Sequence, residues 1–541
     1  MRRRGLALGL GAVLGVLASG DVQAASYEIA AGEDVEAAIA MLQPGDELVL
    51  GGGMYVVNGR FSIDAMGTEA MPIVVRAKDG EVPHIHRPNA GENLVDIDNA
   101  NWLELRGIEW SGGSAGIRMS NVNNLTIADC NIHDTGDVAV RANDGGQTYE
   151  NLHIVGNEIH HTNNTGEGMY LGCNNDGCRL ANSVIERNWV HDTNQASVDQ
   201  GDGIELKEGS YGNIIRDNVI HDTNYPCILT YSAAGNGAAN IIEGNVMWNC
   251  GDHAIQSAAD AVIHNNIILS ANAYGISVQP HQSGAPDNLE IVHNTIVIPG
   301  SRAINVSGAV GTVIVANNAV YSMAGPALQV GGGGQVTVVG NVGLGGYGGG
   351  GYVDGDLNAD FIAAAFSGAV PNDVFPADGA LVGAGDPTYG LDTDFNGLAR
   401  TDPPDVGAYG FDAAGNPGWT LQAGFKGITA DGGDDGMDDG MDDGMDGGMD
   451  DGMDDGPGDG MDDGPGDGMD DGPGDGPGDD GPGDDDGVDG DGGSGGVDGG
   501  QLDGDGGMDD EGGCSCRGGG TGGPVAALAM LALVAVRRRR S

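Results

Sequence analysis

One lysine is the first candidate for a chemical role. The chain has only three lysines, and Lys207 alone lies in its repetitive part, within GDGIELKEGSYGN at residues 201–213. A lysine amine can act as a base or as a fixed positive charge. The alternative is structural, since Lys207 could simply pair with Glu205 or Glu208 on a solvated surface.

A sequence repeat of about 26 residues must position these side chains. Each copy has an Ile or Val three residues before a recurrent asparagine, and nearly always an aliphatic residue two residues after it. The recurrent position holds Cys130, Asn157, Asn188, Asn218, Asn245, Asn266, Asn294, Asn318 and Asn341.

Repeats this short, without a helical period, predict coils of short strands joined by turns. Stacked coils pair their strands in parallel and bury a continuous apolar interior. The recurrent asparagine is expected in a bend, where stacked amides can hydrogen-bond from coil to coil. Cys130 replaces one of these asparagines, and we expect it to be buried. The predicted fold class is therefore an all-β parallel solenoid.

The second strand of each coil carries the candidate residues. These strands follow a glycine, and we place them at residues 138–140, 169–171, 204–206, 228–230, 255–257 and 276–278. Successive side chains of a strand point to opposite faces. One outward column is then predicted to hold Ala139, Tyr170, Glu205, Leu229, Gln256 and Ser277. The next is predicted to hold Arg141, Gly172, Lys207, Tyr231, Ala258 and Gln279. Arg141, Tyr170, Glu205, Lys207 and Tyr231 should thus share one exposed patch.

The two ends of the repetitive part resemble secreted β-helix proteins. Val35, Ala38, Ile39 and Leu42 have the spacing of a short helix that closes the first coil. Residues 44–55 (PGDELVLGGGMY) and 67–77 (GTEAMPIVVRA) resemble the opening coils of β-helix polysaccharide lyases, including the chondroitinase B and alginate lyase family. Residues 394–411 (DFNGLARTDPPDVGAYGF) resemble the closing motif of anchored bacterial β-helix proteins, and we expect a structural role for them. The resemblance implies a right-handed parallel β-helix over residues 26–412.

The same resemblance implies that the patch binds an extended polysaccharide and cleaves it by β-elimination. Such a reaction must stabilise a C6 carboxylate, remove the C5 proton and protonate the leaving oxygen. In this interpretation Lys207 is the base, and Tyr231 or Arg141 is the acid or the carboxylate clamp. Tyr170, Gln256 and Gln279 are the expected substrate contacts. The resemblance also implies calcium as the cofactor, with Glu167, Asp202 and Glu205 as its expected ligands, and no other cofactor is expected.

The resemblance to the lyases is incomplete at the catalytic positions. The chondroitinase B family has glutamates seven and five residues before its lysine, where this chain has Gln200 and Asp202. Family nine pectate lyases carry their base inside a Gly-x-Gly-Phe-Lys-Leu-Gly strand, where this chain has Glu205. A non-catalytic adhesive or carbohydrate-binding protein is therefore the alternative, and an epimerase or hydrolase on the same scaffold comes third.

Histidines recur in register with the repeat. One column is predicted to hold His133, His160, His191, His221 and then Trp248. Stacking of the rings is the expected outcome, and metal binding is the alternative. His84 and His86 stand apart from this column and receive no assignment.

Five cysteines lie in the body of the chain. Cys173 and Cys178 enclose a tight turn, and we expect a disulfide between them because the chain is expected to be exported. The spacing of Cys227 and Cys250 leaves their pairing open.

The two ends of the chain are predicted to be targeting signals. Residues 1–24 have the arginines, apolar run and small residues of a secretory signal peptide. Residues 514–541 hold Cys514 and Cys516, a 13-residue apolar stretch and terminal arginines. This end resembles the MYXO-CTERM sorting signals of myxobacterial surface proteins, which implies processing near one of the two cysteines and tethering at the cell surface. Thirteen helical residues reach only about 20 Å, so a permanent membrane span is not expected.

Composition divides the rest of the chain. Residues 431–510 contain 31 Asp and 31 Gly with no Lys, Arg or aromatic residue, so 431–513 are predicted to be a disordered stalk behind a linker at 413–430. The whole chain carries 80 acidic against 22 basic residues, a formal net charge of −58. Nucleic acid and anionic membranes need a positive face, so neither is an expected partner. We expect an exported monomer that is either anchored to the outer membrane at the cell surface or extracellular. Its expected partners are a polysaccharide and the sorting machinery.

Overall fold

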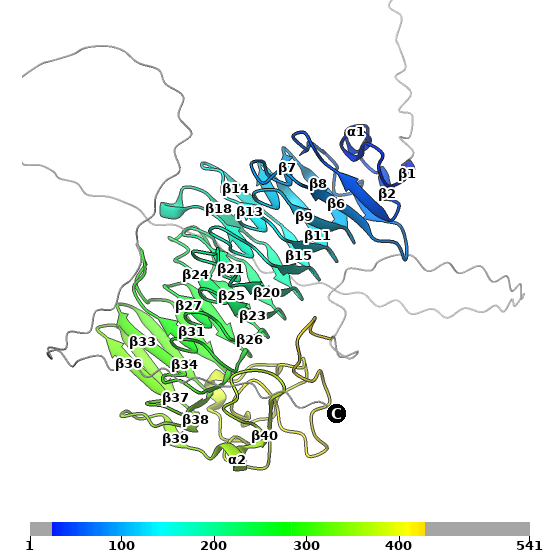
Figure 1. Ribbon diagram of the computed structural model, residues 1–541. Coiled ribbons are helices and arrows are strands. Elements are labelled where there is room, and N and C mark those ends of the chain that lie inside the picture. Colours follow the sequence, from blue (N-terminus) through cyan, green and yellow to red (C-terminus); the bar gives the residue numbers. More distant parts are fainter. Residues whose placement is uncertain (1–23, 283, 428–541) are drawn as a thin grey trace, which may run out of the picture. The chain divides into compact units, whose positions relative to one another are not determined.

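The computed structural model describes residues 24–282 and 284–427. Over most of this range the chain is an all-β solenoid, and its strands stack in chain order along one axis (Figure 1). The predicted stalk, the sorting signal with its two cysteines, and the signal peptide except Ala24 lie outside the described residues. Within the described residues, no helix is long and apolar enough to cross a membrane.

Each coil contributes one strand to each of three parallel sheets. Sheet A contains β1 (Ser26–Ile29), β2 (Glu47–Leu50), β5 (Ile73–Ala77), β8 (Asn101–Arg106), β11 (Asn123–Ala128), β15 (His153–Val155), β19 (Val184–Glu186), β22 (Ile214–Arg216), β25 (Asn240–Glu243), β28 (Ala261–His264), β31 (Leu289–Val292), β34 (Thr312–Ala316) and β37 (Gln335–Val339). Sheet B contains β3 (Gly53–Val56), β6 (Pro83–Arg87), β9 (Glu109–Gly112), β12 (Asn131–His133), β16 (Glu158–His160), β20 (Trp189–Thr193), β23 (Val219–Thr223), β26 (Val246–Trp248), β29 (Ile267–Ile268), β32 (Thr295–Ile298), β35 (Ala319–Ser322), β38 (Asn341–Leu344) and β39 (Tyr352–Asp354). Sheet C contains β4 (Ser62–Ile63), β7 (Val95–Asp98), β10 (Ile117–Ser120), β13 (Val140–Ala142), β17 (Met169–Leu171), β21 (Ile204–Leu206), β24 (Ile228–Thr230), β27 (Ile255–Ser257), β30 (Ile276–Val278), β33 (Ile304–Ala309) and β36 (Leu328–Gly332).

The remaining elements are short and lie outside these three sheets. They are α1 (Val35–Ile39), the parallel pair β14 (Thr148–Glu150) and β18 (Arg179–Ala181), the 3₁₀ turn η1 (Asn174–Asp176), α2 (Leu357–Asp360), the antiparallel pair β40 (Phe361–Ala363) and β41 (Asp373–Pro376), and the 3₁₀ turn η2 (Pro387–Tyr389).

The interior of the solenoid is built by the repeated aliphatic positions. Ile154, Ile185, Ile215 and Ile242 lie in register on successive strands of sheet A, and all four are almost completely buried. Burial of a branched side chain at every rung makes the core continuous along the axis. The alternation in the sequence thus fixes which face of each strand points inward.

Helix α1 closes the first coil, as its spacing predicted. Val35, Ala38, Ile39 and the following Leu42 are all buried. The carboxylate of Asp34 caps the helix by accepting a hydrogen bond from the Ala37 amide at 3.0 Å.

The predicted asparagine ladder is present in the interior. The Asn218 side-chain oxygen accepts hydrogen bonds from the backbone and side-chain amides of Asn188, at 2.9 and 3.0 Å. The Asn218 side chain in turn donates to the Ile185 carbonyl and the Asn245 side-chain oxygen, at 3.0 and 2.9 Å. Cys130 is buried at the start of the ladder, and its backbone amide donates to the Asn157 side chain.

Breaking this ladder should destabilise the solenoid strongly. Asn218→Ala leaves buried donors and acceptors on both neighbouring coils without partners, and each such group costs about 1–3 kcal/mol. We expect the free energy of unfolding, measured with guanidinium chloride, to fall by about 3 kcal/mol or more. Cys130→Ala is the matched control, because Cys130 occupies the same repeated position without an amide. An equal fall in the free energy of unfolding in both variants would contradict a stabilising contribution of the asparagine ladder.

Residues 355–427 leave the parallel sheets and pack on the outer face of sheet B. Their apolar side chains, including Phe361, Phe375 and Tyr409, form a second core with outward residues of the later strands, such as Trp248 and Leu269. Within the segment at 394–411 that resembles a closing motif, Phe395, Val406, Ala408 and Tyr409 are buried in this second core. This motif therefore has a structural role at the side of the later coils.

The end of this segment is also docked. Lys426 lies in the region assigned to a linker, yet its amine contacts the Asp217 carboxylate at 2.5 Å and the Gly244 and Phe395 carbonyls at 3.1 Å. It also lies 3.6 Å from the centre of the Phe395 ring. Residues 413–427 are thus part of the folded body.

Candidate functional site

Three adjacent strands of sheet C bring the main candidates together. Tyr170 of β17, Glu205 of β21 and Leu229 of β24 are aligned in register. Lys207 and Tyr231 follow β21 and β24 directly. The structure brings these four residues together as predicted. The predicted exposure of the patch is wrong, because Glu205, Lys207 and Tyr231 are buried.

The predicted strand that carries Arg141 was misplaced by two residues. Strand β13 is Val140–Ala142, so Arg141 and not Ala139 lies opposite Tyr170. Ala139 is completely buried, and its backbone occupies the level of Gly168 on the next coil. The sequence analysis placed each of these strands shortly after a glycine, and this rule (the glycine template) started the strand too early here. The reason is that this coil has one glycine before the strand, whereas the next two coils have two.

Arg141 is therefore one rung from Tyr170 but does not join the lysine cluster. Its guanidinium bonds the Asn143 side chain at 2.7 Å and lies 3.6 Å from the Asp137 carboxylate, and its side chain is 35 % exposed. Arg118 of β10 lies beside it in register and pairs with Asp144 at 2.6 Å. These two partly exposed arginines form a row on sheet C, and each lies beside at least one carboxylate.

Lys207 lies at the centre of the cluster. Its amine donates a hydrogen bond to Glu205 Oε1 at 2.8 Å, and the two side chains are 5 % and 2 % exposed. The amine also lies 4.7 and 4.9 Å from the ring centres of Tyr170 and Tyr231. The pairing with Glu205 that the sequence left as an alternative thus exists, but as a buried pair enclosed by aromatic rings.

The surroundings of Lys207 keep its amine and the hydroxyls of Tyr170 and Tyr231 protonated. Burial alone would lower the pKa of Lys207, but the charge and the hydrogen bond of Glu205 together with Tyr170 outweigh it and raise that pKa above its ordinary value. Burial raises the pKa of Tyr170 to about 12, although the positive charge of Lys207 opposes the shift. Burial and the charge of Glu205 also raise the pKa of Tyr231. At neutral pH the site therefore holds an ammonium group and two protonated phenols.

Two loops cover the cluster. Tyr231 donates to Glu205 Oε1 at 3.2 Å, while its hydroxyl also contacts His281 Nε2 at 3.2 Å and the Gln282 side-chain amide at 3.4 Å. The Gln282 amide reaches across to the Asn174 side chain at 3.4 Å, which joins this loop to η1. His281 and Gln282 were missed by the sequence analysis, and the only signal for them was the longer step of 28 residues between Asn266 and Asn294.

The three predicted metal ligands do converge. Glu167, Asp202 and Glu205 are all buried, and one oxygen of each lies within 4.8 Å of the others. Both Asp202 oxygens, Glu167 Oε2 and Glu205 Oε2 are buried without a hydrogen-bond partner. Two oxygens on opposite sides of a calcium ion at about 2.4 Å are separated by about 4.8 Å, so this spacing and the unpaired oxygens fit calcium.

The three buried carboxylates repel one another when no metal ion lies between them. Burial and the nearby charge of Glu205 raise the pKa of Glu167 to about 7. Burial, followed by the charges of Glu205 and Glu167, raises the pKa of Asp202 well above its ordinary value. The cluster therefore gains from either protons or a bound cation.

Two predicted substrate contacts lie farther along the sheet. Gln256 is two strands from Glu205 in the same column, beyond Leu229, and is buried. Gln279 directly follows β30, one strand beyond Gln256. The structure therefore places both glutamines away from Lys207.

The cysteines form two disulfides within the described residues. Cys173 and Cys178 are bonded as predicted, in the loop that carries η1. Cys227 and Cys250 are also bonded and link successive coils, a pairing that the sequence left open. The Cys173–Cys178 bond stiffens one of the two loops that cover Lys207.

The predicted histidine column is stacked. His133, His160, His191, His221 and Trp248 follow one another with ring centres 4.3–5.3 Å apart and interplanar angles of 3–14°. Burial, together with the neighbouring histidines, lowers the pKa of His160 to about 4. The stacking prediction is confirmed for all five residues.

The chain is similar to one family model and to several solved structures. A family model described as a right-handed β-helix region matches residues 193–320, which supports the predicted handedness. No curated protein matches the sequence. Among solved structures, an alginate lyase from Paenibacillus sp. str. FPU-7 is 19 % identical, with a TM-score of 0.40, over 58 % of this chain and 99 % of its own. The pectate lyase Pel9A is 14 % identical, with a TM-score of 0.42, over 72 % and 98 %. PfbA, a surface adhesin of Streptococcus pneumoniae, is 12 % identical, with a TM-score of 0.41, over 60 % and 92 %.

Proposed function

We propose that this protein binds an extended acidic polysaccharide along sheet C and cleaves it by β-elimination. The observation that carries the proposal is the cluster itself, in which one lysine, two tyrosines and three carboxylates meet on adjacent rungs β17, β21 and β24. A base, a proton donor and a site for positive charge are the three requirements of the reaction.

The proton movements can be assigned to particular atoms. Lys207 Nζ can accept a C5 proton only when its own proton has been released to solvent, and the bond to Glu205 Oε1 at 2.8 Å opposes that release. The Tyr231 hydroxyl is protonated at neutral pH because burial and Glu205 raise its pKa, and we assign it as the donor to the leaving oxygen. Tyr170 packs its ring against the amine and helps to position it.

Charge on the substrate must be balanced by the site. Glu167, Asp202 and Glu205 would hold a calcium ion, which would supply positive charge against a sugar carboxylate. Arg118 and Arg141 present two partly exposed guanidinium groups on neighbouring rungs, where they could bond sugar carboxylates in exchange for their present carboxylate partners.

Binding without cleavage is the second candidate function. The burial of both members of the Lys207 and Glu205 pair favours it, because the ammonium lies beneath the loops of η1 and Gln282. In that case the arginine row would retain the polymer, and the buried pair would only support the surface.

The deciding experiment is a substrate panel. The full-length protein is incubated with alginate, pectate, chondroitin and neutral glycans, with and without calcium, and the ultraviolet absorbance of the unsaturated product is followed. Product from at least one acidic polymer is expected. If no polymer is cut but acidic polymers are retained on a column of the immobilised protein, cleavage is refuted and the binding function stands.

We also propose that the protein is exported and tethered to the cell surface through the sorting signal. The support is the sequence pattern of residues 1–24 and 514–541. Deleting residues 514–541 should release the protein into the medium, as measured by immunoblotting of cells and supernatant. Full retention of the truncated protein on cells would refute the tether, and a point variant such as Lys207→Met serves as the retained control.

A further inference from the structure

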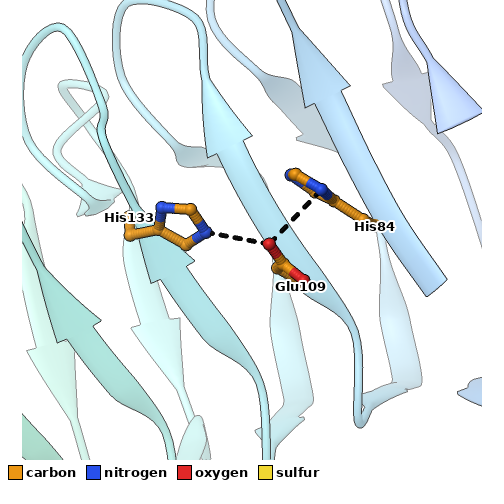
Figure 2. A group of neighbouring side chains, drawn as sticks. All are labelled: His84, Glu109 and His133. Atoms are coloured by element: carbon orange, nitrogen blue, oxygen red, sulfur yellow. Dashed lines mark hydrogen bonds and ion pairs between the residues drawn. The ribbon is translucent and has the colours of Figure 1, made fainter. Parts of the chain in front are cut away.

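Three side chains on sheet B converge outside the lysine cluster. His84 of β6, Glu109 of β9 and His133 of β12 come from three successive strands, and the two imidazole rings lie on either side of the carboxylate (Figure 2). Glu109 Oε1 lies 3.3 Å from His84 Nδ1 and 3.2 Å from His133 Nε2. We propose that His84, Glu109 and His133 form a zinc site that clamps these three coils together.

The distances match the geometry that zinc requires. With ligands about 2.0–2.1 Å from the metal, the atoms of a tetrahedral zinc site are separated by about 3.3 Å. Both nitrogen to oxygen distances agree with that edge length, and all three ligand atoms lie within 4.8 Å of one another. Two imidazoles and one carboxylate are ligands that suit zinc.

The outer nitrogen of each ring already has a partner. His133 Nδ1 lies 2.8 Å from the Asp134 carboxylate, which fixes the proton on that nitrogen and leaves the Nε2 lone pair directed at Glu109. His84 Nε2 lies 2.6 Å from the Ser111 hydroxyl, and His86 Nδ1 lies 2.8 Å from the same oxygen. When the Ser111 hydroxyl donates its one hydrogen bond to His86 Nδ1, His84 Nε2 donates a hydrogen bond to the Ser111 oxygen. His84 Nδ1 then carries no proton and is free to bind metal. Such outer partners orient metal-binding histidines.

A position farther along the same sheet shows what makes this place distinct. His191 contacts Glu158 at 3.3 Å and Asp192 at 2.7 Å, so it repeats the relation of His133 to Glu109 and Asp134. On the preceding strand, however, the residue that pairs with Glu158 is Asn131, whereas the residue that pairs with Glu109 is His84. A second histidine, His160, also lies near Glu158, with its Nε2 at 4.0 Å from Glu158 Oε1. That nitrogen is bonded to the Asn131 side-chain oxygen at 3.1 Å, whereas His84 Nδ1 faces Glu109.

An ion can reach this site from solvent. The side chains of His84, Glu109 and His133 are 20 %, 28 % and 15 % exposed. Three protein ligands leave one position of a tetrahedral site open to water. The site belongs to sheet B, whereas the carboxylates of Glu167, Asp202 and Glu205 are associated with sheet C, so the two can be tested separately.

The test uses the full-length protein after metal has been removed with a chelator. Titration with Co²⁺ should produce the intense visible absorption of a four- or five-coordinate site, and added Zn²⁺ should abolish it at one equivalent. Carboxylates of the Asp-rich region give only the weak spectrum of octahedral Co²⁺, so they do not imitate this signal. Absence of the intense band in the unmodified protein would overturn the proposal.

Two variants and a matched control locate the site. Glu109→Gln keeps the shape of the ligand, and His84→Asn installs the side chain that Asn131 already provides at the equivalent level before Glu158. Each should lower the affinity for Zn²⁺ by at least about 10-fold to 100-fold, since loss of an outer partner alone has that effect. Glu158→Gln removes the comparable carboxylate beside His191 and should leave the affinity unchanged.

Folding is monitored in the same proteins. Zn²⁺ should raise the thermal unfolding midpoint of the unmodified protein and of Glu158→Gln, but not that of Glu109→Gln or His84→Asn. If either ligand variant does not fold, the other decides, and His133→Asn replaces it. An equal loss of affinity in Glu158→Gln and Glu109→Gln would also overturn the proposal.

Discussion

Lys207→Met is expected to lower the rate of formation of the unsaturated product by at least about 100-fold, because a positioned acid or base contributes about 10²–10⁴-fold to such reactions. The amine lies between two tyrosine rings and bonds Glu205, and methionine retains most of the length of the side chain without a proton to exchange. The measurement is the initial rate of absorbance increase on the polymer that the panel identifies. Undiminished activity would refute the assignment of Lys207.

This substitution needs a control for folding. Removing Lys207 leaves Glu205 buried without its partner, which costs about 3–5 kcal/mol of stability. The double variant Glu205→Gln/Lys207→Met removes both charges and should recover most of the free energy of unfolding while remaining inactive. Lys78→Met is the matched surface control, because Lys78 pairs with Glu28 in an exposed position and should affect neither activity nor stability. If the double variant recovers both stability and activity, the lysine has a structural role only.

The fold could be predicted from the sequence because each coil repeats the same physical requirements. The Asn ladder from Asn157 to Asn341 and the buried isoleucines fix the inward face, and both recur with every copy. The stacking from His133 to Trp248 follows from the same periodicity, and the helix at Val35 follows from the helical spacing of its own apolar residues. Local patterns repeated many times over outweigh the ambiguity of any single strand.

The predictions that were wrong or missing concern features that do not repeat from coil to coil. The glycine template misplaced the strand of Arg141, because the number of glycines before the strand changes at that coil. The loop of His281 and Gln282 reaches Tyr231 from coils farther along the chain, and a pattern within one copy carries no information on such a contact. His84 also received no assignment, although it lies 25 residues before Glu109 and therefore about one coil away. Contacts between coils require the register, which only the structure supplies.

The three buried carboxylates predict an unusual dependence of stability on pH. The pKa of Glu167 is raised to about 7 in the folded protein, mainly by burial and then by Glu205, against an ordinary value of 4.5. The folded state therefore binds a proton at Glu167 more tightly than the unfolded state. The contribution of Glu167 to stability is thus greatest below about pH 4.5 and is lost as the pH rises through about 7. Because a tenfold change in proton affinity corresponds to about 1.4 kcal/mol, Glu167 alone should account for about 3 kcal/mol. Histidines whose pKa is lowered, such as His160, change stability in the opposite direction over part of this range. The contribution should therefore be measured, without divalent cations, as the difference in pH dependence of the free energy of unfolding between the unmodified protein and Glu167→Gln.

Calcium should reverse this loss at pH 8. A ligand at one hundred times its dissociation constant stabilises the folded state by about 2.7 kcal/mol, so added CaCl₂ should raise the free energy of unfolding by that order.

The double variant Glu167→Gln/Asp202→Asn should lose both the pH-dependent contribution of these carboxylates and the response to calcium, since it removes two of the three charges. Glu69→Gln, at an exposed position, should behave like the unmodified protein. Because the measurement is the stability of the folded body, weak binding of calcium to the Asp-rich region does not imitate it. An equal response to calcium in the double variant would place the ion elsewhere.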